Sequence, residues 1–183
     1  DEIFSDAEKY NGGEVSEFHI VGGLHPDLPF EYYLDMLKGL KLRFPEVHIQ
    51  AFTAIELGYL AELAKLPLDE TLIVLKDAGL GSIPGGGAEI FAKRVRRKIC
   101  GEKLIAEDWL NVHETAHGLG LKSNATMLYG HLETVEERAD HLVRLRELQD
   151  KTNGFVTFIP LAFHPENTVL EFLNTTPGQL DLR

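Results

Sequence analysis

The amino-acid sequence predicts an α/β protein that forms part of a parallel (β/α) barrel, with about five βα units. Two observations lead to this fold class. Strand-like and helix-like segments alternate along the chain, and polar or glycine-rich motifs follow directly after the strands. Such alternation implies a parallel sheet with right-handed crossovers, which occurs in barrels and in doubly wound sheets. A complete eight-unit barrel usually takes about 250 residues, so a chain of 183 residues fits part of one.

Three of the predicted strands lie in the first half of the chain, at residues 18–21, 47–52 and 80–83. Each is a short β-prone run, and Gly22-Gly23 closes the first of them. Helices are predicted between them over residues 29–40, 55–63 and 69–79, where apolar residues recur at helical spacing. Pro29 suits a first helical position, Asp69 predicts an N-cap, and Gly79 predicts the end of that helix.

The second half of the chain continues the alternation. Helices are predicted over residues 106–119 and 134–150, and strands over residues 124–128 and 155–160. Thr134 begins the long helix, because Thr134-Val135-Glu136-Glu137 matches the capping-box pattern. The polar and glycine-rich motifs therefore follow the strands at what both fold types use as the ligand-binding edge.

Composition excludes several classes of protein. Hydrophobic residues make up 44% and charged residues 26%, as in an ordinary globular chain, and residues 1–183 are expected to form a single domain. The formal net charge of −11 argues against nucleic-acid binding. The single cysteine, Cys100, excludes a disulfide framework and a cysteine-only metal site. The chain has neither a membrane-length apolar run nor a signal-peptide pattern, so a cytoplasmic location is expected.

One motif matches a zinc-hydrolase signature. His113-Glu114-Thr115-Ala116-His117 reads H-E-x-x-H, which on a helix places two imidazoles on one face and a glutamate as a possible base. The candidates for a third ligand are Glu133, Glu136 and Glu137. The alternative is an ordinary amphipathic helix that packs on the outside of the sheet with both histidines against it.

A glycine-rich turn and a basic cluster form a second group of candidates. Pro84-Gly85-Gly86-Gly87 lies between a strand and a helix and allows the backbone to approach a ligand closely, while Glu89 could accept hydrogen bonds from ribose hydroxyls. The turn could equally be a tight connection that needs small residues. Residues 93–98 are the basic cluster, and with Lys103 they could form either a solvated helix face or an anion subsite for a carboxylate.

Two histidines, His25 and His164, each precede a proline at a predicted strand end, where the catalytic groups of a barrel converge. A single histidine is more often structural, but two at one edge favour a role in the site. Cys100 has no partner cysteine and is expected to be incidental.

Taken in order, the strand-end motifs resemble one enzyme family, the radical S-adenosylmethionine enzymes of menaquinone biosynthesis by the futalosine route. The resemblance runs from about residue 15 to the end of the chain. It rests on residues 21–29, 51–56, 84–90, 123–131 and 158–168, together with Glu133-Thr134 and Glu137-Arg138. The aminofutalosine synthase branch fits best. Its alternatives are the dehypoxanthine futalosine cyclase branch, which typically has Gln in place of His164, and the branch that makes a deazaflavin-coenzyme precursor.

The resemblance implies a radical reaction in a barrel or partial barrel. In the family a C-x3-C-x2-C loop holds a 4Fe-4S cluster that binds S-adenosylmethionine, and an electron donor such as flavodoxin or ferredoxin reduces it. The resulting 5′-deoxyadenosyl radical adds to the enolpyruvyl group of 3-[(1-carboxyvinyl)oxy]benzoate. Rearrangement and loss of the carboxyl carbon then give aminofutalosine.

The resemblance also implies roles for individual residues. For the cofactor, Gly22 and Gly23 match the pair that receives the methionine amino group, and Thr53 and Glu56 face the pocket at the next strand end. The remaining cofactor positions are Ser82 and Glu89 at the ribose, Lys103 at the methionine carboxylate, and Thr126 and Ile159 near adenine. The residues implied on the substrate side, as base or carboxylate partners, are His25, Tyr129 and His164.

The chain departs from the family in one respect, because the three cluster cysteines are absent from it. We therefore expect the 183 residues to be the central part of a longer enzyme, without its cluster-binding segment and its last barrel units. We also expect this chain to be inactive on its own. The other expectations for the chain are a zinc hydrolase that uses His113, Glu114 and His117, and a non-catalytic nucleoside-binding module. Exposed strand edges of a partial barrel make a homo-oligomer plausible.

Overall fold

A single parallel sheet organises the computed structural model, which describes residues 2–10, 13, 15–101 and 105–167. Its strands are β1 (Glu17–Ile20), β2 (His48–Ala51), β3 (Ser82–Ile83), β4 (Lys122–Tyr129) and β5 (Phe155–Ala162). They lie in the order β1-β2-β3-β4-β5 and every neighbouring pair is parallel. A doubly wound sheet reverses its strand order at a switch point, whereas this order never reverses. The sheet is therefore a section of a (β/α) barrel wall, which confirms the predicted fold class.

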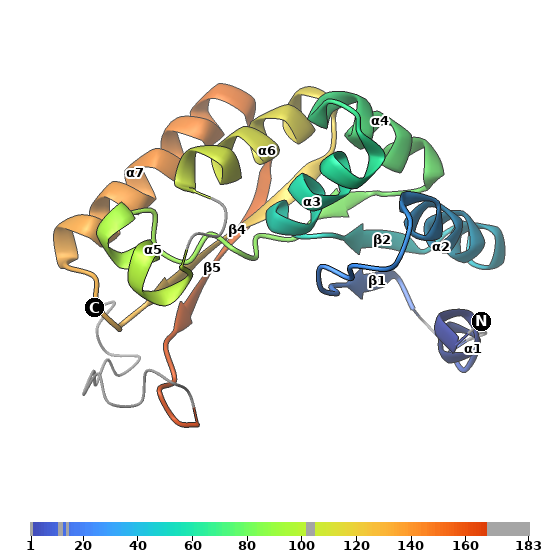
Figure 1. Ribbon diagram of the computed structural model, residues 1–183, viewed down its shortest axis with the longest axis horizontal. Helices are drawn as coiled ribbons and strands as arrows, with labels where there is room; N and C mark the ends of the chain where they lie inside the picture. The colour runs from blue at the N-terminus through green and yellow to red at the C-terminus, as the bar shows by residue number, and fades with distance from the viewer. Residues whose placement is uncertain (1, 11–12, 14, 102–104, 168–183) are drawn as a thin grey trace.

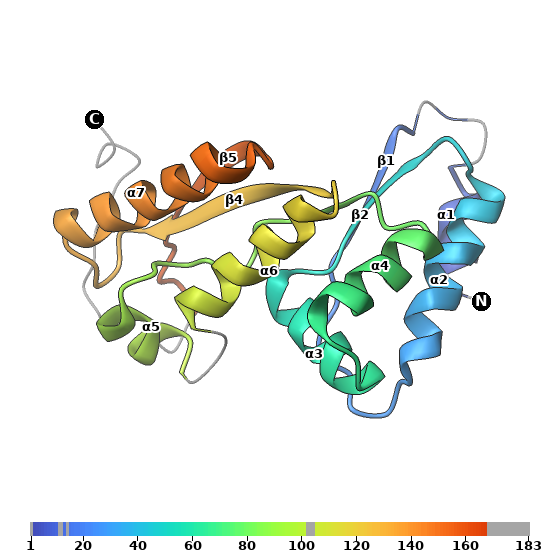
Figure 2. The same cartoon turned by 90° about the horizontal axis from the view of Figure 1, so that it is seen from above.

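The helices α2 (Phe30–Arg43), α3 (Ala54–Ala64), α4 (Leu68–Ala78), α6 (Ala106–Gly118) and α7 (Val135–Thr152) cover one face of this sheet (Figure 1). The remaining helices are α1 (Glu2–Glu8), which lies beside β1 at the edge of the sheet, and α5 (Lys93–Ile99). Seen from above, α2, α4, α6 and α7 form a row across the sheet (Figure 2). None of the helices in the described residues is long and apolar enough to cross a membrane.

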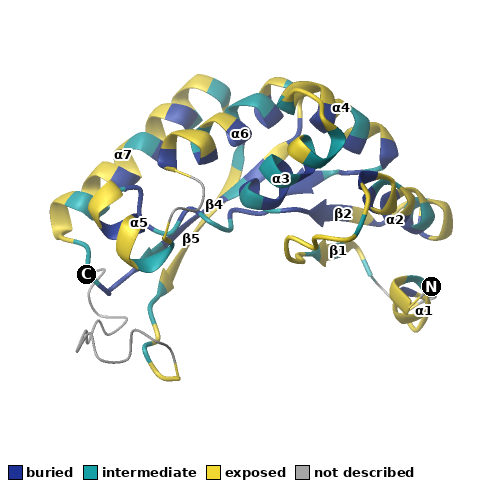
Figure 3. Cartoon of the chain, viewed as in Figure 1, coloured by how far each residue is buried: buried dark blue, intermediate teal, exposed yellow. Residues whose placement is uncertain are grey.

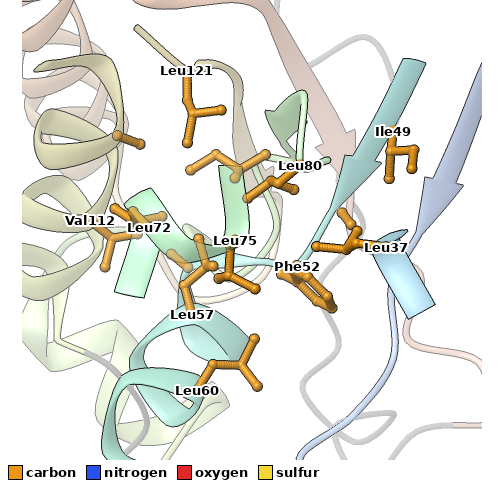
Figure 4. Close-up of a cluster of buried hydrophobic side chains, with 14 of the residues drawn as sticks. Leu37, Ile49, Phe52, Leu57, Leu60, Leu72, Leu75, Leu80, Val112 and Leu121 are labelled. Atoms are coloured by element: carbon orange, nitrogen blue, oxygen red, sulfur yellow. The ribbon is translucent and has the colours of Figure 1, made fainter. Parts of the chain in front are cut away.

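Most of the hydrophobic core lies between the helices and the sheet. The helices turn their buried sides towards the strands and their exposed sides outwards (Figure 3). Figure 4 shows the centre of this core, where side chains of α2, α3, α4 and α6 meet those of the strands and the segments next to them. The labelled side chains are Leu37, Ile49, Phe52, Leu57, Leu60, Leu72, Leu75, Leu80, Val112 and Leu121.

The ends of the helices follow their local sequence, with small corrections to the predicted bounds. Thr134 caps α7 in the predicted capping box with Glu137. The predicted N-cap at Asp69 is wrong: α4 begins at Leu68, directly after Pro67, and Asp69 lies in its first turn, where an acidic side chain favours the helix dipole. Gly79 ends α4 as predicted, with φ of 120°.

The edge strands of the described sheet are more exposed than its central strands. β5 is largely exposed along its length, and Val156, Phe158 and Leu161 are 70%, 41% and 47% exposed. The central strands β2 to β4 are mostly buried. In a closed barrel the next strand and helix would cover β5, so its exposed apolar residues fit the interpretation that this chain forms part of a barrel wall.

Candidate functional site

The loops that follow the carboxyl ends of the strands carry most of the residues predicted for the site. Because all five strands run in the same direction, these loops meet at one edge of the sheet. They are residues 21–25 after β1, 52–56 after β2, 84–89 after β3, 130–133 after β4 and 163–167 after β5. The predicted convergence of these motifs at one edge is therefore present in the structure.

The loop after β1 is tied to the start of α3 by Glu56. The Gly22 N–H donates to Glu56 Oε1 at 2.9 Å, and the Thr53 N–H and hydroxyl donate to Glu56 Oε2 at 2.8 and 2.7 Å. Thr53 also caps α3 in a capping box with Glu56. Glu56 is only 8% exposed, and both of its oxygens already accept hydrogen bonds. Thr53 and Glu56 therefore position Gly22 and its loop in this structure.

The same loop continues through Gly23 to His25. A Cβ added at Gly23 would meet nothing within 4 Å, so open space adjoins the backbone there. The Tyr59 hydroxyl donates to the His25 carbonyl at 2.7 Å, and the Asp27 N–H donates to His25 Nδ1 at 3.2 Å. His25 is exposed, and these bonds place it at the strand-end edge.

The glycine-rich loop after β3 is held by its carbonyl groups. Four successive carbonyls accept hydrogen bonds from side chains, and the fifth accepts one from the backbone of β4. The bonds are Thr126 Oγ1 to Gly85 O (2.5 Å), Trp109 Nε1 to Gly86 O (3.1 Å), Arg96 Nη2 to Gly87 O (3.2 Å), Arg96 Nη1 to Ala88 O (2.6 Å) and Leu128 N to Glu89 O (2.9 Å). The N–H groups of residues 85–89 have no partner within the described residues. The loop thus keeps unpaired backbone donors, which backbone sites for anions and polar ligands use.

Arg96 was not predicted to hold this loop. The basic cluster was expected to be a solvated face or an anion subsite, but Arg96 is 5% exposed and binds the loop carbonyls. Lys93, Arg97 and Lys98 are exposed, in keeping with a solvated face, and Arg94 pairs with Glu137 at 2.6 Å. The spacing of basic residues alone could not single out the one that turns inwards.

Glu89 is the acidic residue at this edge with the clearest capacity to bind a ligand. Its φ of 45° is unusual for a non-glycine residue, and its half-buried carboxylate has no partner within the described residues. It lines a cavity of about 160 Å³ together with Gly87, Leu128, His131 and Phe163. A strained backbone that presents an unpaired carboxylate is a feature of functional sites.

The residues predicted on β4 face two different sides. Thr126 faces away from the helices and reaches the glycine-rich loop. Tyr129 is 3% exposed and packs with Ile90, Val95 and Met127 in a cluster between β4 and α5, so its ring does not face the same side as Thr126. Strand side chains alternate, and three positions separate the two residues, which accounts for the difference.

The loop after β4 is fixed by Glu133, which was predicted only as a possible zinc ligand. Its fully buried carboxylate accepts from Arg138 Nε at 2.8 Å, from the His131 N–H at 2.9 Å and from the Gly130 N–H. Burial alone would raise the pKa of Glu133, but hydrogen bonds from the Gly130 and His131 N–H groups lower it on balance. Glu133 is thus a buried carboxylate that anchors the loop.

The other predicted residues lie in different surroundings. Ser82 begins β3, below the glycine-rich loop, and its hydroxyl bonds with His48 and Gln50. Ile159 pairs with Thr126 across β4 and β5 and is 39% exposed. His164 is exposed in the loop after β5, without a hydrogen-bond partner in the described part of the chain. Lys103 lies outside the described residues.

The H-E-x-x-H motif of α6 forms a hydrogen-bonded network, which corrects the zinc-hydrolase hypothesis. His113 Nδ1 and His117 Nε2 each lie 2.8 Å from Ser123 Oγ, and His117 Nδ1 lies 2.8 Å from Thr152 Oγ1. The Glu114 carboxylate instead pairs with Lys151 on the outer surface. Within the described residues no three His, Cys, Asp or Glu side chains converge on a point that could hold a metal ion.

The network also fixes the protonation of the two histidines. Thr152 Oγ1 donates to Leu148 O, so it accepts from His117 Nδ1–H, which leaves His117 Nε2 to accept from Ser123. Burial lowers the pKa of His113 well below its usual value and lowers that of His117 to about 4. Both imidazoles are therefore neutral parts of the core at neutral pH.

Comparisons with known proteins agree with this architecture. The radical SAM superfamily profile matches residues 1–145. The chain is 56% identical over 163 residues to aminodeoxyfutalosine synthase of Thermus thermophilus, covering 89% of this chain and 44% of that protein. It is 40% identical over 184 residues to 5-amino-6-(D-ribitylamino)uracil–L-tyrosine 4-hydroxyphenyl transferase 1 of Methanosarcina mazei, covering 97% of this chain and 48% of that protein.

A solved structure shows the same fold at lower sequence similarity. The crystal structure of methylornithine synthase superposes on 99% of this chain and 50% of its own, with a TM-score of 0.71 and 16% sequence identity. The chain thus spans about half the length of the relatives it matches. Together with the parallel barrel-wall sheet, the profile match shows that the chain belongs to the radical SAM superfamily.

Proposed function

We propose that this chain forms the S-adenosylmethionine-binding part of an enzyme of the aminodeoxyfutalosine synthase type. The observation that carries the proposal is the 56% identity to the Thermus thermophilus synthase over 89% of the chain. That match spans most of the strand-end loops described above. Because the chain covers 44% of that relative, we propose the activity for the complete protein of which this chain is a part.

The described residues fit S-adenosylmethionine. Glu89 offers a free carboxylate that can accept from both ribose hydroxyls, and the N–H groups of residues 85–89 offer donors beside it. The open backbone at Gly23 can receive the methionine end. When bound and reduced by one electron, the cofactor would supply a 5′-deoxyadenosyl radical for addition to the enolpyruvyl group of 3-[(1-carboxyvinyl)oxy]benzoate.

The described residues do not fit a 4Fe-4S cluster. Such clusters are held by cysteine thiolates, and Cys100 is the only cysteine in the chain. We therefore propose that the cluster ligands lie outside these 183 residues and that the chain alone does not cleave S-adenosylmethionine. The electron would come from a donor of the flavodoxin or ferredoxin type.

A second candidate function is that of the tyrosine 4-hydroxyphenyl transferases. The 40% identity over 97% of the chain supports it. The strand-end loops are compatible with either activity, because both proposals place the cofactor there and differ in the second substrate. The higher identity to the synthase favours the first proposal.

The test is an anaerobic assay of the full-length product of the gene. The protein is reconstituted with iron and sulfide, reduced with flavodoxin, and supplied with S-adenosylmethionine and either the enolpyruvyl benzoate or tyrosine with the ribitylaminouracil. We expect aminodeoxyfutalosine, identified by mass, from the first substrate only. Product from tyrosine would establish the second function, and binding of S-adenosylmethionine without cleavage would favour a nucleoside-binding module.

Replacing Glu89 should weaken binding of the nucleoside. Glu89→Gln keeps the shape but removes the charged acceptor, and hydrogen bonds to charged groups contribute about 1.5–3 kcal/mol. We expect an affinity for 5′-deoxyadenosine lower by roughly 10-fold or more, measured by calorimetry on the full-length protein. Glu70→Gln on the exposed face of α4 is the matched control, and equal affinities for the two variants would contradict the assignment.

A further inference from the structure

The face of the sheet that turns away from the helices carries a continuous set of polar side chains. Strand side chains alternate, and Ile49, Ile83 and Ser123 face the helices. Their neighbours therefore face the other side of the sheet, which is the interior of the barrel wall. The interior residues at this level are Glu17 and His19 of β1, His48 and Gln50 of β2, Ser82 of β3, Asn124 of β4 and Thr157 of β5.

This composition is unusual for a barrel interior. In (β/α) barrels the interior is usually packed by layers of branched apolar side chains. Here every interior position at this level is polar, although the same strands present Ile49 and Ile83 to the helices. Of these residues Gln50 and Ser82 are buried, and buried polar groups need partners, so this part of the interior suits a polar group.

Four of these residues form a bonded group, which we call the polar layer: His48, Gln50, Ser82 and Asn124. Gln50 Nε2 donates to Ser82 Oγ at 3.1 Å, His48 Nε2 lies 2.7 Å from the same oxygen, and Asn124 Nδ2 donates to Gln50 Oε1 at 3.4 Å. Gln50 and Ser82 are 7% and 5% exposed. Each amide nitrogen has two hydrogens, so Gln50 and Asn124 each keep one N–H without a partner in the described residues.

The interior face of the sheet becomes apolar between the polar layer and the end of β4. Leu128 and Ile159 face the same side as Asn124 and Thr126, and Leu128 pairs with Leu161. Four residues of strand separate Asn124 from Leu128, which is about 13 Å at 3.3 Å per residue. A ligand that reaches from the cofactor edge to the polar layer therefore passes an apolar wall and ends at amide donors.

That sequence of surroundings matches one class of ligand. We propose that the polar layer binds the ring carboxylate of an aromatic acid substrate, with the free N–H groups of Gln50 and Asn124 donating to it. His48 and Ser82 hold the Gln50 amide in place, and the aromatic ring lies against Ile159, which pairs with Thr126 two residues further along β4 from Asn124. The enolpyruvyl end then points towards Glu89 and the loops at the strand ends. This inference rests on the proposed function, because it assigns a subsite to the proposed substrate.

The test compares Gln50→Leu with a control on the opposite face of the same strand, Ile49→Val, in the reconstituted full-length protein. We expect Gln50→Leu to raise KM for the enolpyruvyl benzoate at least 10-fold. Ile49→Val should leave KM unchanged, and thermal unfolding checks that both variants fold.

A substrate analogue separates recognition of the carboxylate from a general effect on the site. The phenyl enolpyruvyl ether lacks the ring carboxylate, so its KM should be the same for wild type and Gln50→Leu. An equal loss with both substrates would overturn the proposal, as would an unchanged KM for the benzoate in Gln50→Leu.

Direct binding keeps this inference distinct from the proposed function. With 3-hydroxybenzoate as the probe, Gln50→Leu should lower the affinity at least 10-fold, measured by calorimetry without reductant. If the probe binds the wild type at least 10-fold more tightly than Gln50→Leu, but the wild type does not turn over the enolpyruvyl benzoate, the proposed function is overturned. The proposal that the polar layer binds a carboxylate is then still supported. If the wild type turns over the enolpyruvyl benzoate while Gln50→Leu leaves KM and probe affinity unchanged, the proposed function is supported. The proposal that the polar layer binds the ring carboxylate is then overturned.

Discussion

Acidification between pH 6.5 and 4 should strongly destabilise the fold. Burial lowers the pKa of His117 to about 4 and that of His141 also to about 4, and it lowers the pKa of His113 well below its usual value. All three side chains lie between helices and sheet, at most 9% exposed. The folded state therefore keeps these imidazoles neutral, whereas the unfolded chain protonates them near pH 6.5.

The direction of the pH effect on stability follows from the linkage between proton binding and folding. Because the folded pKa values lie below the unfolded ones, the stabilisation is fully present above pH 6.5 and is lost as the pH falls towards 4. One pKa unit corresponds to about 1.4 kcal/mol, so His117 and His141 together account for a loss of roughly 6 kcal/mol. Whole domains are stable by only about 5–15 kcal/mol. We therefore expect unfolding before pH 4 is reached.

Urea unfolding at intervals between pH 7 and 4.5 measures this effect. The free energy of unfolding should fall with a slope of up to about 1.4 kcal/mol per pH unit for each histidine. His117→Gln removes one titrating group, so its slope should be shallower than that of the wild type. Thr115→Ala, a change at a partly exposed position of the same helix, should not alter the slope. A free energy that does not change across this range would contradict the prediction.

His141 illustrates what sequence reasoning could not identify. It stands in the middle of α7 without any motif around it. In the structure its Nδ1 accepts from the Phe91 N–H at 3.2 Å and its Nε2 donates to the Thr126 carbonyl at 2.9 Å, so it ties the loop after β3 to β4. Fifty residues separate His141 from Phe91. Such a contact depends on how helix and strand pack, which local spacing does not report.

The order of elements was predictable because it depends on local signals. Apolar runs, Pro29, Gly79 and the Thr134 capping box act over a few residues, and they predicted five strands and the strand-end loops. The direction in which a side chain points depends on register as well. Ser123 and Asn124 are neighbours, yet one joins the histidines of α6 and the other joins the polar layer. A one-residue error in register reverses such an assignment.

The H-E-x-x-H motif also shows that local spacing does not determine what a side chain contacts. Its residues satisfy the zinc pattern in sequence, and both histidines do lie on one face of a helix. On that face both imidazoles contact Phe155 of β5, His113 also contacts Trp109 of the same helix, and Ser123 lies between the two imidazoles. The surroundings of the helix, rather than its spacing, decide between metal binding and packing.

Substituting Gly85 should damage both the fold and the cofactor site. A Cβ on Gly85 would lie 2.7 Å from the Asn124 carbonyl oxygen and 2.9 Å from the carbonyl carbons of Asn124 and Ala125. These are backbone atoms of the central strand β4, so they cannot move aside as a side chain could. In Gly85→Ala the loop must withdraw from β4 and lose its bond from Thr126. Overpacking of this kind costs about 1–3 kcal/mol.

Moving the loop also displaces the groups proposed to bind the ligand. Four side-chain hydrogen bonds hold the carbonyls of residues 85–88, and Glu89 follows directly in the chain. We expect Gly85→Ala to lower the affinity of the full-length protein for S-adenosylmethionine at least 10-fold, measured by calorimetry, besides the loss of stability in urea. Gly118→Ala is the matched control, since its Cβ would meet nothing within 4 Å at the end of α6. If the two alanine variants behave alike, the close approach at Gly85 does not hold the loop. If only Gly85→Ala loses both properties, the glycine is required because β4 leaves no room for a side chain where the loop must present Glu89.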